Sequence, residues 1–369
     1  MINKLDNTPL NAATVVVTCA SALIAVWLLL HAQSAVAVDA MTQTGTKFKA
    51  DADMQSVLDA LAAMKGKPIE SLTPTEARAQ PTPTDAVMAV LKKQGKDTRP
   101  TALVPGVTST DREIPGAAGP IAVRVYTPAG KGPFPVVVYF HGGGWIIANK
   151  EVYDGGARGI AKQANAIVIS VDYRLAPEAK FPAAWDDALA AYKWAAANAA
   201  SMNGNPQKMG LAGESAGGNL AISTAIAVRD AGMQKPMAVL AVYPVAQTGN
   251  LSTASYVDSA TAKPLNKAMI EWFVGHLFKN PADKADPRID LVRANLVGLP
   301  PVTIINAQID PLRDDGMLIA DALKKAGVKV DRKIYDGVTH EFFGTAAAVK
   351  DAAEAQKYAG QQLRQAFGK

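Results

Sequence analysis

GLAGESAGGNLA, residues 210–221, holds a single serine, Ser215, between Gly213 and Gly217. Apolar residues precede the serine and helix-forming residues follow it, so we predict that it lies on a tight turn between a strand and a helix. The glycines then have a steric role, because side chains beside such a turn would collide with the neighbouring strand and helix. The pattern favours a nucleophilic serine. The other interpretation is a small-residue turn without chemistry, and residues elsewhere must decide between the two.

Strand-like and helix-like stretches alternate through most of the chain. Near-continuous apolar runs, typical of strands covered on both faces, occupy 135–140, 166–173, 237–244 and 301–307, and 121–128 alternates like a half-exposed strand. Helical stretches occupy 152–164, 183–200, 217–231 and 313–326. This order predicts an α/β fold, with a mostly parallel central sheet flanked by helices. The alternation stops over about 250–298, which we interpret as a helical insertion.

A serine becomes a useful nucleophile when a base takes its proton, and histidine is the usual base. The chain has 4 histidines, and His31 lies in an apolar N-terminal stretch. His276 falls in the helical insertion, and His141 begins a glycine-rich loop. His340 follows a strand-like stretch at 328–335 and is our candidate for the base.

The carboxylate that orients the histidine is expected after a late strand. Asp310, at the end of PVTIINAQID (301–310), follows such a strand and is our candidate. Asp314 and Asp315 compete with it, but both fall in the first helical turn, where the helix dipole favours acidic residues. Asp336 is close to the histidine in sequence, and we expect it to shape a turn with Gly337.

Donors for a tetrahedral oxyanion are predicted in a second glycine cluster. The apolar run 135–140 ends in HGGGW, and a strand followed by H-G-G-G supplies backbone N–H groups in one class of esterases and lipases. We assign the amides of Gly143 and Gly144, together with that of Ala216, and expect His141 to tie the loop down. A phosphate or dinucleotide loop is the rival interpretation, but neither G-x-G-x-x-G nor G-K-[ST] is present at either cluster.

Six motifs in order resemble one known family: HGGGW (141–145), YRLAPE (173–178), FPAAWDD (181–187), GESAGGNL (213–220), DPLRDDG (310–316) and THEF (339–342). They are similar to the motifs of the hormone-sensitive-lipase-like branch of α/β hydrolases, the bacterial serine esterases also called the α/β hydrolase-3 family. The resemblance covers about residues 100–369. The sequence differs from the family pattern at two positions: the family often has aspartate where this chain has Glu214, and glutamate where it has Asp315.

The resemblance implies an α/β-hydrolase fold with Ser215, Asp310 and His340 as a catalytic triad. It also implies a helical cap over an acyl pocket, built from an N-terminal segment, 38–105, and the insertion at about 250–298 of a catalytic domain, 106–369. We therefore expect a serine carboxylesterase that cleaves short- to medium-chain acyl esters through an acyl-enzyme. A lipase, amidase or peptidase of the same fold, or a catalytically silent small-molecule binding protein, are the alternatives.

The expected partner is a small-molecule ester substrate, with no metal and no organic cofactor. A formal charge of +5, 6% aromatic residues and the lack of a basic run argue against a nucleic-acid partner. Oligomeric state is left open.

The first 37 residues are predicted to be a signal peptide. Residues 12–30 are mostly apolar, and Ala35-Val36-Ala37 has the small-x-small pattern of a cleavage site. We expect an exported protein, periplasmic or secreted. The alternative is a membrane anchor formed by 12–30, because that run approaches the roughly 20 residues that span a bilayer; membrane contact is expected only in that case. The only cysteine, Cys19, lies in this segment, so cysteine chemistry is excluded after cleavage.

Overall fold

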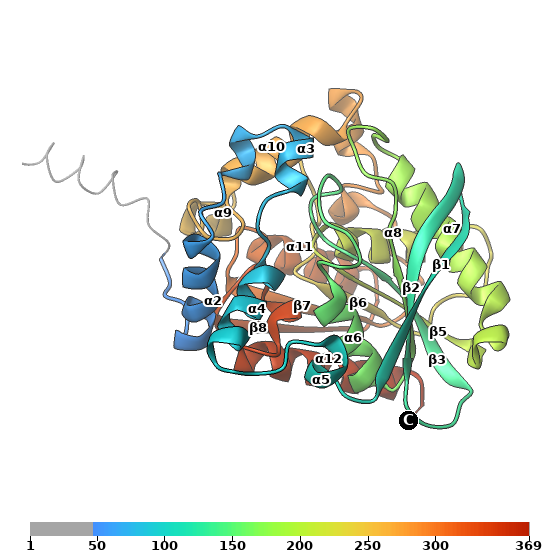
Figure 1. The fold of residues 1–369 in the computed structure, drawn as a ribbon. Helices are drawn as coiled ribbons and strands as arrows, with labels where there is room; N and C mark the ends of the chain where they lie inside the picture. The colour runs from blue at the N-terminus through green and yellow to red at the C-terminus, as the bar shows by residue number, and fades with distance from the viewer. Residues whose placement is uncertain (1–46, 369) are drawn as a thin grey trace, which may run out of the picture. The chain divides into compact units, whose positions relative to one another are not determined.

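The computed structural model describes residues 47–368, so the predicted signal segment lies outside the described residues. They form an eight-stranded sheet in the order β1-β2-β4-β3-β5-β6-β7-β8 (Figure 1). The strands are β1 (Val107–Gly116), β2 (Gly119–Pro128), β3 (Phe134–Phe140), β4 (Ile167–Val171), β5 (Gly204–Glu214), β6 (Val239–Val242), β7 (Val302–Ile309) and β8 (Val330–Thr339). Strands β3 to β8 pair in parallel, whereas β1 and β2 join antiparallel at one edge. The prediction of a mostly parallel sheet is confirmed.

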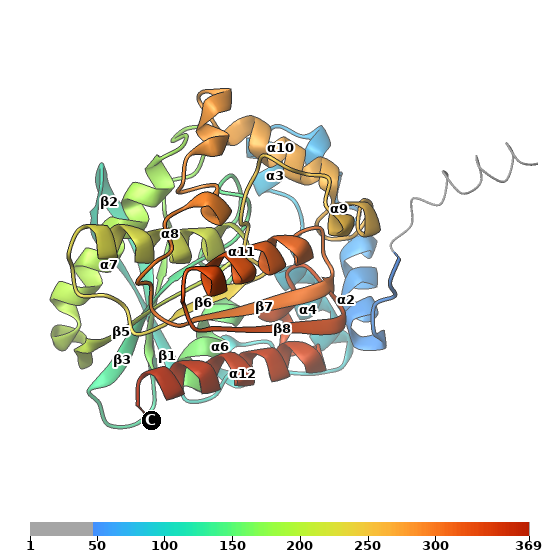
Figure 2. The same ribbon diagram turned by 180° about the vertical axis from the view of Figure 1, so that it is seen from behind.

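Helices cover both faces of this sheet (Figure 2). On one face pack α7 (Ala183–Asn198), α8 (Ala216–Asp230) and α11 (Arg313–Lys325). On the other pack α6 (Asp154–Ala164) and α12 (Lys350–Ala366). Each of α6, α7, α8 and α11 begins within about two residues of the boundary read from the sequence.

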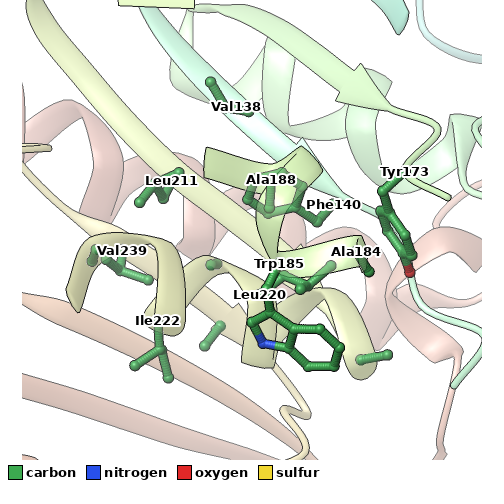
Figure 3. Packing of buried hydrophobic residues seen from close by; sticks show 14 of the residues in the cluster. Val138, Phe140, Tyr173, Ala184, Trp185, Ala188, Leu211, Leu220, Ile222 and Val239 are labelled. Atoms are coloured by element: carbon green, nitrogen blue, oxygen red, sulfur yellow. The ribbon is translucent and has the colours of Figure 1, made fainter. Parts of the chain in front are cut away.

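Strand β3 shows why the apolar runs are continuous. All seven of its residues are buried. Val138 and Phe140 face the core that includes Leu220 and Trp185, as Figure 3 shows, while Tyr139 faces the opposite core around α6 and α12. Because successive side chains of a strand point to opposite faces, a strand covered on both sides needs apolar residues at every position.

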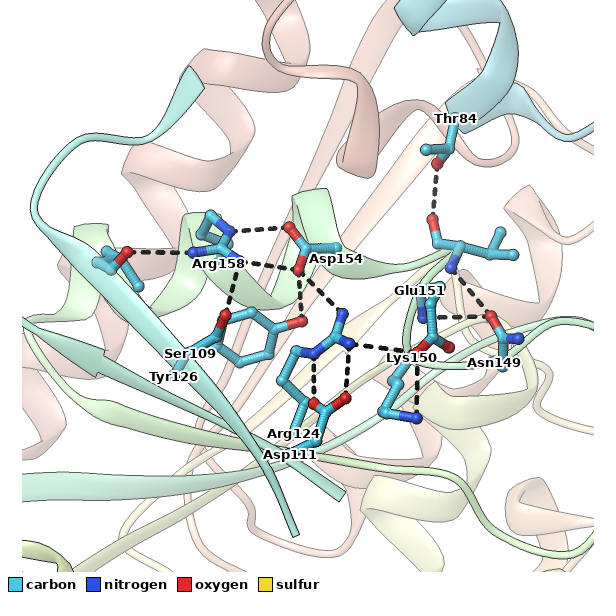
Figure 4. A network of polar contacts seen from close by, with 12 residues as sticks. Thr84, Ser109, Asp111, Arg124, Tyr126, Asn149, Lys150, Glu151, Asp154 and Arg158 are labelled. Carbon is cyan, nitrogen blue, oxygen red and sulfur yellow. Dashed lines mark hydrogen bonds and ion pairs between the residues drawn. The ribbon is translucent and has the colours of Figure 1, made fainter. Parts of the chain in front are cut away.

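The edge strand β1 was not predicted from the sequence. Most of its side chains are exposed, so it has no apolar run that would reveal it. It forms a hairpin with β2, and Arg124 of β2 binds Asp111 of β1 through Nε at 2.6 Å and Nη2 at 2.9 Å (Figure 4). A cross-strand charge pair therefore adds to the pairing of the two strands at this edge.

The described part of the N-terminal segment, from residue 47 on, contains the helices α2 (Ala52–Ala63), α3 (Pro74–Arg78), α4 (Pro83–Lys93) and α5 (Pro100–Leu103). Thr73 and Glu76 form a capping box that starts α3, with the threonine oxygen accepting from the Glu76 amide and the glutamate accepting from the Thr73 amide. The insertion contains α9 (Ala254–Asp258) and α10 (Lys267–Leu277). Figure 1 shows α10 beside α3, and the indole N–H of Trp272 donates to the Leu72 carbonyl at 3.0 Å.

Within residues 47–368, no helix has both the length and the apolar character needed to cross a membrane.

Candidate active site

Ser215 lies between the end of β5 and the start of α8, in a strained backbone conformation with φ 56° and ψ −118°. Its amide donates to the Val242 carbonyl of the neighbouring strand at 2.8 Å, which holds the turn against the sheet. A Cβ on Gly213 would lie 2.1 Å from the Gly217 carbonyl oxygen, and one on Gly217 would lie 2.0 Å from that of Phe140. Both glycines are therefore required sterically, as predicted from the sequence.

The structure brings His340 and Asp310 to this serine. Nε2 of His340 lies 3.0 Å from the Ser215 hydroxyl, and Nδ1 lies 2.8 Å from Oδ2 of Asp310. The other oxygen of Asp310 accepts from the Leu312 amide at 2.8 Å. Asp310 directly follows β7 and His340 directly follows β8, so parallel pairing carries both to the edge of the sheet where β5 ends.

The electrostatic environment of His340 favours its protonated form. Burial lowers the pKa of this imidazole, but the neighbouring Asp310 carboxylate, with Glu341, outweighs burial and raises the pKa above its ordinary value. The ring of Tyr243 also packs against the imidazole, with 4.5 Å between ring centroids. A histidine in this setting accepts a proton more readily than one in water.

The glycine loop after β3 lies beside the serine. Gly143 has φ +93° and Gly144 has φ +59°, conformations that side chains rarely adopt. A Cβ on Gly143 would lie 2.2 Å from the Ile147 carbonyl oxygen, and one on Gly144 would lie 2.3 Å from Cγ of Phe273. Ala216 is the first residue of α8, where backbone amides have no partner within the helix.

The other histidines have different surroundings. His141 is buried, its Nδ1–H donates to the Gly142 carbonyl at 2.7 Å, and its ring stacks on Tyr173 with 4.3 Å between centroids. This arrangement fits the expected structural role in the loop. His276 lies on α10 and packs edge-on against Trp272.

Asp315 lies in the first turn of α11, as the sequence predicts, whereas the expectation for Asp336 was wrong. Asp315 is fully buried, and its carboxylate accepts from the Ala246 amide at 2.9 Å, so it binds the loop after β6 as well as lying in a first helical turn. Asp336 and Gly337 do not form a turn, because β8 continues through both of them to Thr339. The Gly337 amide instead donates to the Gln308 side chain at 3.0 Å, and the Gly337 carbonyl accepts from the Asp51 amide at 2.8 Å, contacts that the residue types do not reveal.

A cavity of about 720 Å³ opens above the serine. Ser215, His340, Gly143 and Gly144 line its floor. Parts of the N-terminal segment, of the loop after β3 and of the insertion line the rest, including Leu61, Ala77, Pro81, Ile147, Val152, Leu265, Met269 and Phe273. The N-terminal segment and the insertion therefore border the same cavity as Ser215.

Arg78 was not singled out in the sequence. Its guanidinium makes two hydrogen bonds to Glu178, at 2.8 and 2.7 Å, and donates to the carbonyls of Ile146 and Ala176. It thereby joins the N-terminal segment to the glycine loop. A single arginine in a short helix carries no sequence signal of this role, because its partners lie 68 to 100 residues away.

Glu214, beside the nucleophile, is fully buried between two tyrosines. The hydroxyls of Tyr139 and Tyr243 each lie 2.5 Å from one of its oxygens. Burial raises the pKa of Glu214 to about 8. Gly156 makes room for this side chain, since a Cβ there would lie 2.0 Å from Oε1 of Glu214.

Among the described residues, no group of three or more His, Cys, Asp or Glu side chains is arranged to hold a metal ion.

Comparison with known proteins connects this geometry to a family. A family model described as the alpha/beta hydrolase fold matches residues 137–344. The carboxylesterase NlhH of Mycobacterium tuberculosis is 40% identical over 240 residues, which cover 64% of this chain and 75% of that protein. Esterase LipI of the same organism is 38% identical over 260 residues, covering 68% and 80%. An esterase structure from Pyrobaculum calidifontis has a TM-score of 0.73 at 34% identity and covers 83% of this chain and 96% of that one.

Proposed function

Because the chain belongs to the hormone-sensitive-lipase-like family of α/β hydrolases, whose compared members are named esterases, we propose that it hydrolyses carboxylic esters with Ser215 as nucleophile. The observation that carries the proposal is the chain of contacts from Ser215 through His340 to Asp310, at 3.0 and 2.8 Å. Both distances are within the range at which a proton can be transferred or a ring held in one orientation. The resemblance of the motifs and the names of the relatives point to the same chemistry.

In the first half of the reaction, His340 takes the proton from the Ser215 hydroxyl as that oxygen attacks the ester carbonyl. Asp310 holds the imidazole with its Nδ1–H toward the carboxylate and stabilises the positive charge that develops. The amides of Gly143, Gly144 and Ala216 are assigned to the oxyanion. His340 then gives its proton to the departing alcohol, which leaves an acyl group on the serine.

In the second half, His340 takes a proton from water, and the resulting nucleophile attacks the acyl-serine. The tetrahedral intermediate uses the same amides, and its collapse returns the proton to the serine oxygen. No other group is required, since the carboxylic acid and the alcohol together account for the ester and one water. The 720 Å³ cavity supports an ester of modest size as substrate.

Hydrolysis of p-nitrophenyl butyrate by purified protein tests the proposal. We expect wild type to be active and Ser215→Ala and His340→Ala each to lose at least about 10⁴-fold in kcat. Ser201→Ala, at an exposed serine, is the matched control and should keep full activity. A wild-type protein that cleaves no ester and is not labelled by a serine-directed phosphonate contradicts the proposal.

We also propose that the protein is exported. The apolar run at 12–30 and the Ala35-Val36-Ala37 site support this proposal. N-terminal sequencing of protein recovered from the periplasm or medium should find a start at Val38. Retention of Met1 in a membrane fraction would instead favour an anchor.

A further inference from the structure

Glu341 has an unusual backbone for its residue type. It directly follows His340 and has φ +69° and ψ 4°, in the left-handed region. Only glycine enters this region without a steric cost, so a glutamate here lowers stability relative to glycine. Strain of this kind at a site suggests that the side chain is used.

The carboxyl group of Glu341 is held in one position by Tyr153. The tyrosine hydroxyl donates to Oε1 at 2.5 Å. This hydroxyl fits under the glycine loop because Gly142 has no side chain, and a Cβ there would lie 2.2 Å from it. Hydrogen bonds also hold the backbone just before Tyr153. The side chain of Asn149 accepts from the amides of residues 151 and 152, and Thr84 donates to the carbonyl of residue 152 at 2.6 Å (Figure 4).

One oxygen of this carboxyl group has no protein partner. Glu341 lines the same cavity as Ser215, and its side chain is 20% exposed. Within residues 47–368, Oε1 receives the hydrogen bond from Tyr153 and Oε2 receives none. Because this oxygen faces the cavity and is not used by the protein, it can accept a hydrogen bond from a bound ligand.

The location of Glu341 indicates which part of the substrate it meets. Its Oε1 lies 3.8 Å from Nε2 of His340. That nitrogen must come within hydrogen-bonding distance of the departing alcohol oxygen to protonate it, so the alcohol part of the ester lies next to Nε2. The carbonyl oxygen points instead toward the amides of the glycine loop. Glu341 is therefore adjacent to the alcohol part.

We propose that Glu341 makes the enzyme selective for esters whose alcohol part carries a hydrogen-bond donor close to the ester oxygen, such as a hydroxyl on the second carbon. The inference rests on the proposed function. Glu341 is thus a specificity-determining residue, since it contacts the departing alcohol and takes no proton from the serine. Burial raises the pKa of its carboxyl group, and the neutral and ionised forms both accept a hydrogen bond from a hydroxyl.

Two esters with the same acyl group test this. In 2-hydroxyethyl butyrate a hydroxyl replaces the terminal methyl of propyl butyrate, so the pair differs in one donor and hardly in size. The measurement is the ratio of their kcat/KM values in wild type, Glu341→Gly and Glu341→Gln. Glycine suits the left-handed backbone, so this variant removes the carboxyl group without adding strain. The glutamine variant keeps the volume of the side chain and offers an amide oxygen, which is a weaker hydrogen-bond acceptor than a carboxylate oxygen.

We expect the ratio to favour the hydroxyl ester about tenfold more in wild type than in Glu341→Gly, the effect of one hydrogen bond to a carboxyl group. Glu341→Gln should fall between the two and provides the test if the glycine variant does not fold. Equal ratios in wild type and both variants overturn the inference. So does a folded glycine variant that cleaves neither ester, because Glu341 would then act on the chemistry itself. Wild type that cleaves neither these esters nor p-nitrophenyl butyrate overturns the proposed function instead.

Discussion

Glu214 should make the stability of this protein fall as the pH rises. Its carboxyl group is fully buried against Tyr139 and Tyr243, and burial raises its pKa from 4.5 to about 8. The folded protein therefore keeps a proton on Glu214 that the unfolded chain loses above pH 4.5. The contribution of Glu214 to the free energy of unfolding is therefore fully present below pH 4.5 and is lost as the pH rises to about 8.

The magnitude follows from the two pKa values. Each pH unit between them corresponds to about 1.4 kcal/mol, so the full effect is about 5 kcal/mol, and the part between pH 5 and pH 8 is about 3.5 kcal/mol. In Glu214→Gln the side chain has the same shape but no proton to lose. Its amide can donate to one tyrosine oxygen and accept from the other hydroxyl.

Urea unfolding of wild type and Glu214→Gln at pH 5, 6, 7 and 8, at constant ionic strength, measures this difference. The free energy of unfolding of wild type relative to the variant should decrease by about 3.5 kcal/mol over that range. Glu113→Gln, the same change at an exposed glutamate of β1, is the matched control and should follow wild type. Parallel pH dependences of wild type and Glu214→Gln would refute the reasoning, because the buried carboxyl group would then titrate alike in the folded and unfolded states.

Three further predictions concern the reaction itself. Asp310→Asn should lower kcat by about 10⁴-fold with KM little changed, since the imidazole loses the partner that orients it; steady-state kinetics on p-nitrophenyl butyrate measure this, and a loss below tenfold would contradict the assignment. The value of kcat/KM should fall at low pH with a midpoint above pH 6.5 in wild type, because the raised pKa of His340 keeps the base protonated below that midpoint. In Asp310→Asn the midpoint should move to lower pH. A midpoint that does not move would exclude the carboxylate as the cause of the raised pKa. Gly143→Ala should lower kcat by about 10² to 10³-fold, because its Cβ would meet the Ile147 carbonyl and displace a donor amide. The matched control is Gly95→Ala, at a glycine with φ +69° and no atom within 4 Å of the added Cβ, which should cost about 1 kcal/mol of stability and no activity.

Much of the fold could be read from the sequence because buried parallel strands and amphipathic helices differ in period. The run at 135–140 became β3 with every residue buried, and the stretch at 217–231 became α8. Strand β1 was not predicted because its side chains are mostly exposed and polar or charged in its middle part, and such a pattern also fits a loop. The backbone partner across the hairpin makes it a strand.

The candidate triad could also be chosen from the sequence. Only a few histidines had to be weighed, and an aspartate that directly follows a late strand is carried by parallel pairing to the same edge as the serine. Arg78 and Glu341 could not be found this way. Their partners are far away along the chain, and their residue types are common on any protein surface.

The residue types and their order were sufficient for the fold class, the glycines at the turn of Ser215 and the choice of His340 and Asp310 as candidates, because these depend on local sterics and on where strands end. The protonation of Glu214 and the role of Glu341 depend on folding. Burial removes the water that would solvate the Glu214 carboxylate, and tyrosines distant in sequence bind the carboxyl groups of both residues. A carboxyl group acquires such properties from its neighbours in space, which the order of residues along the chain does not reveal.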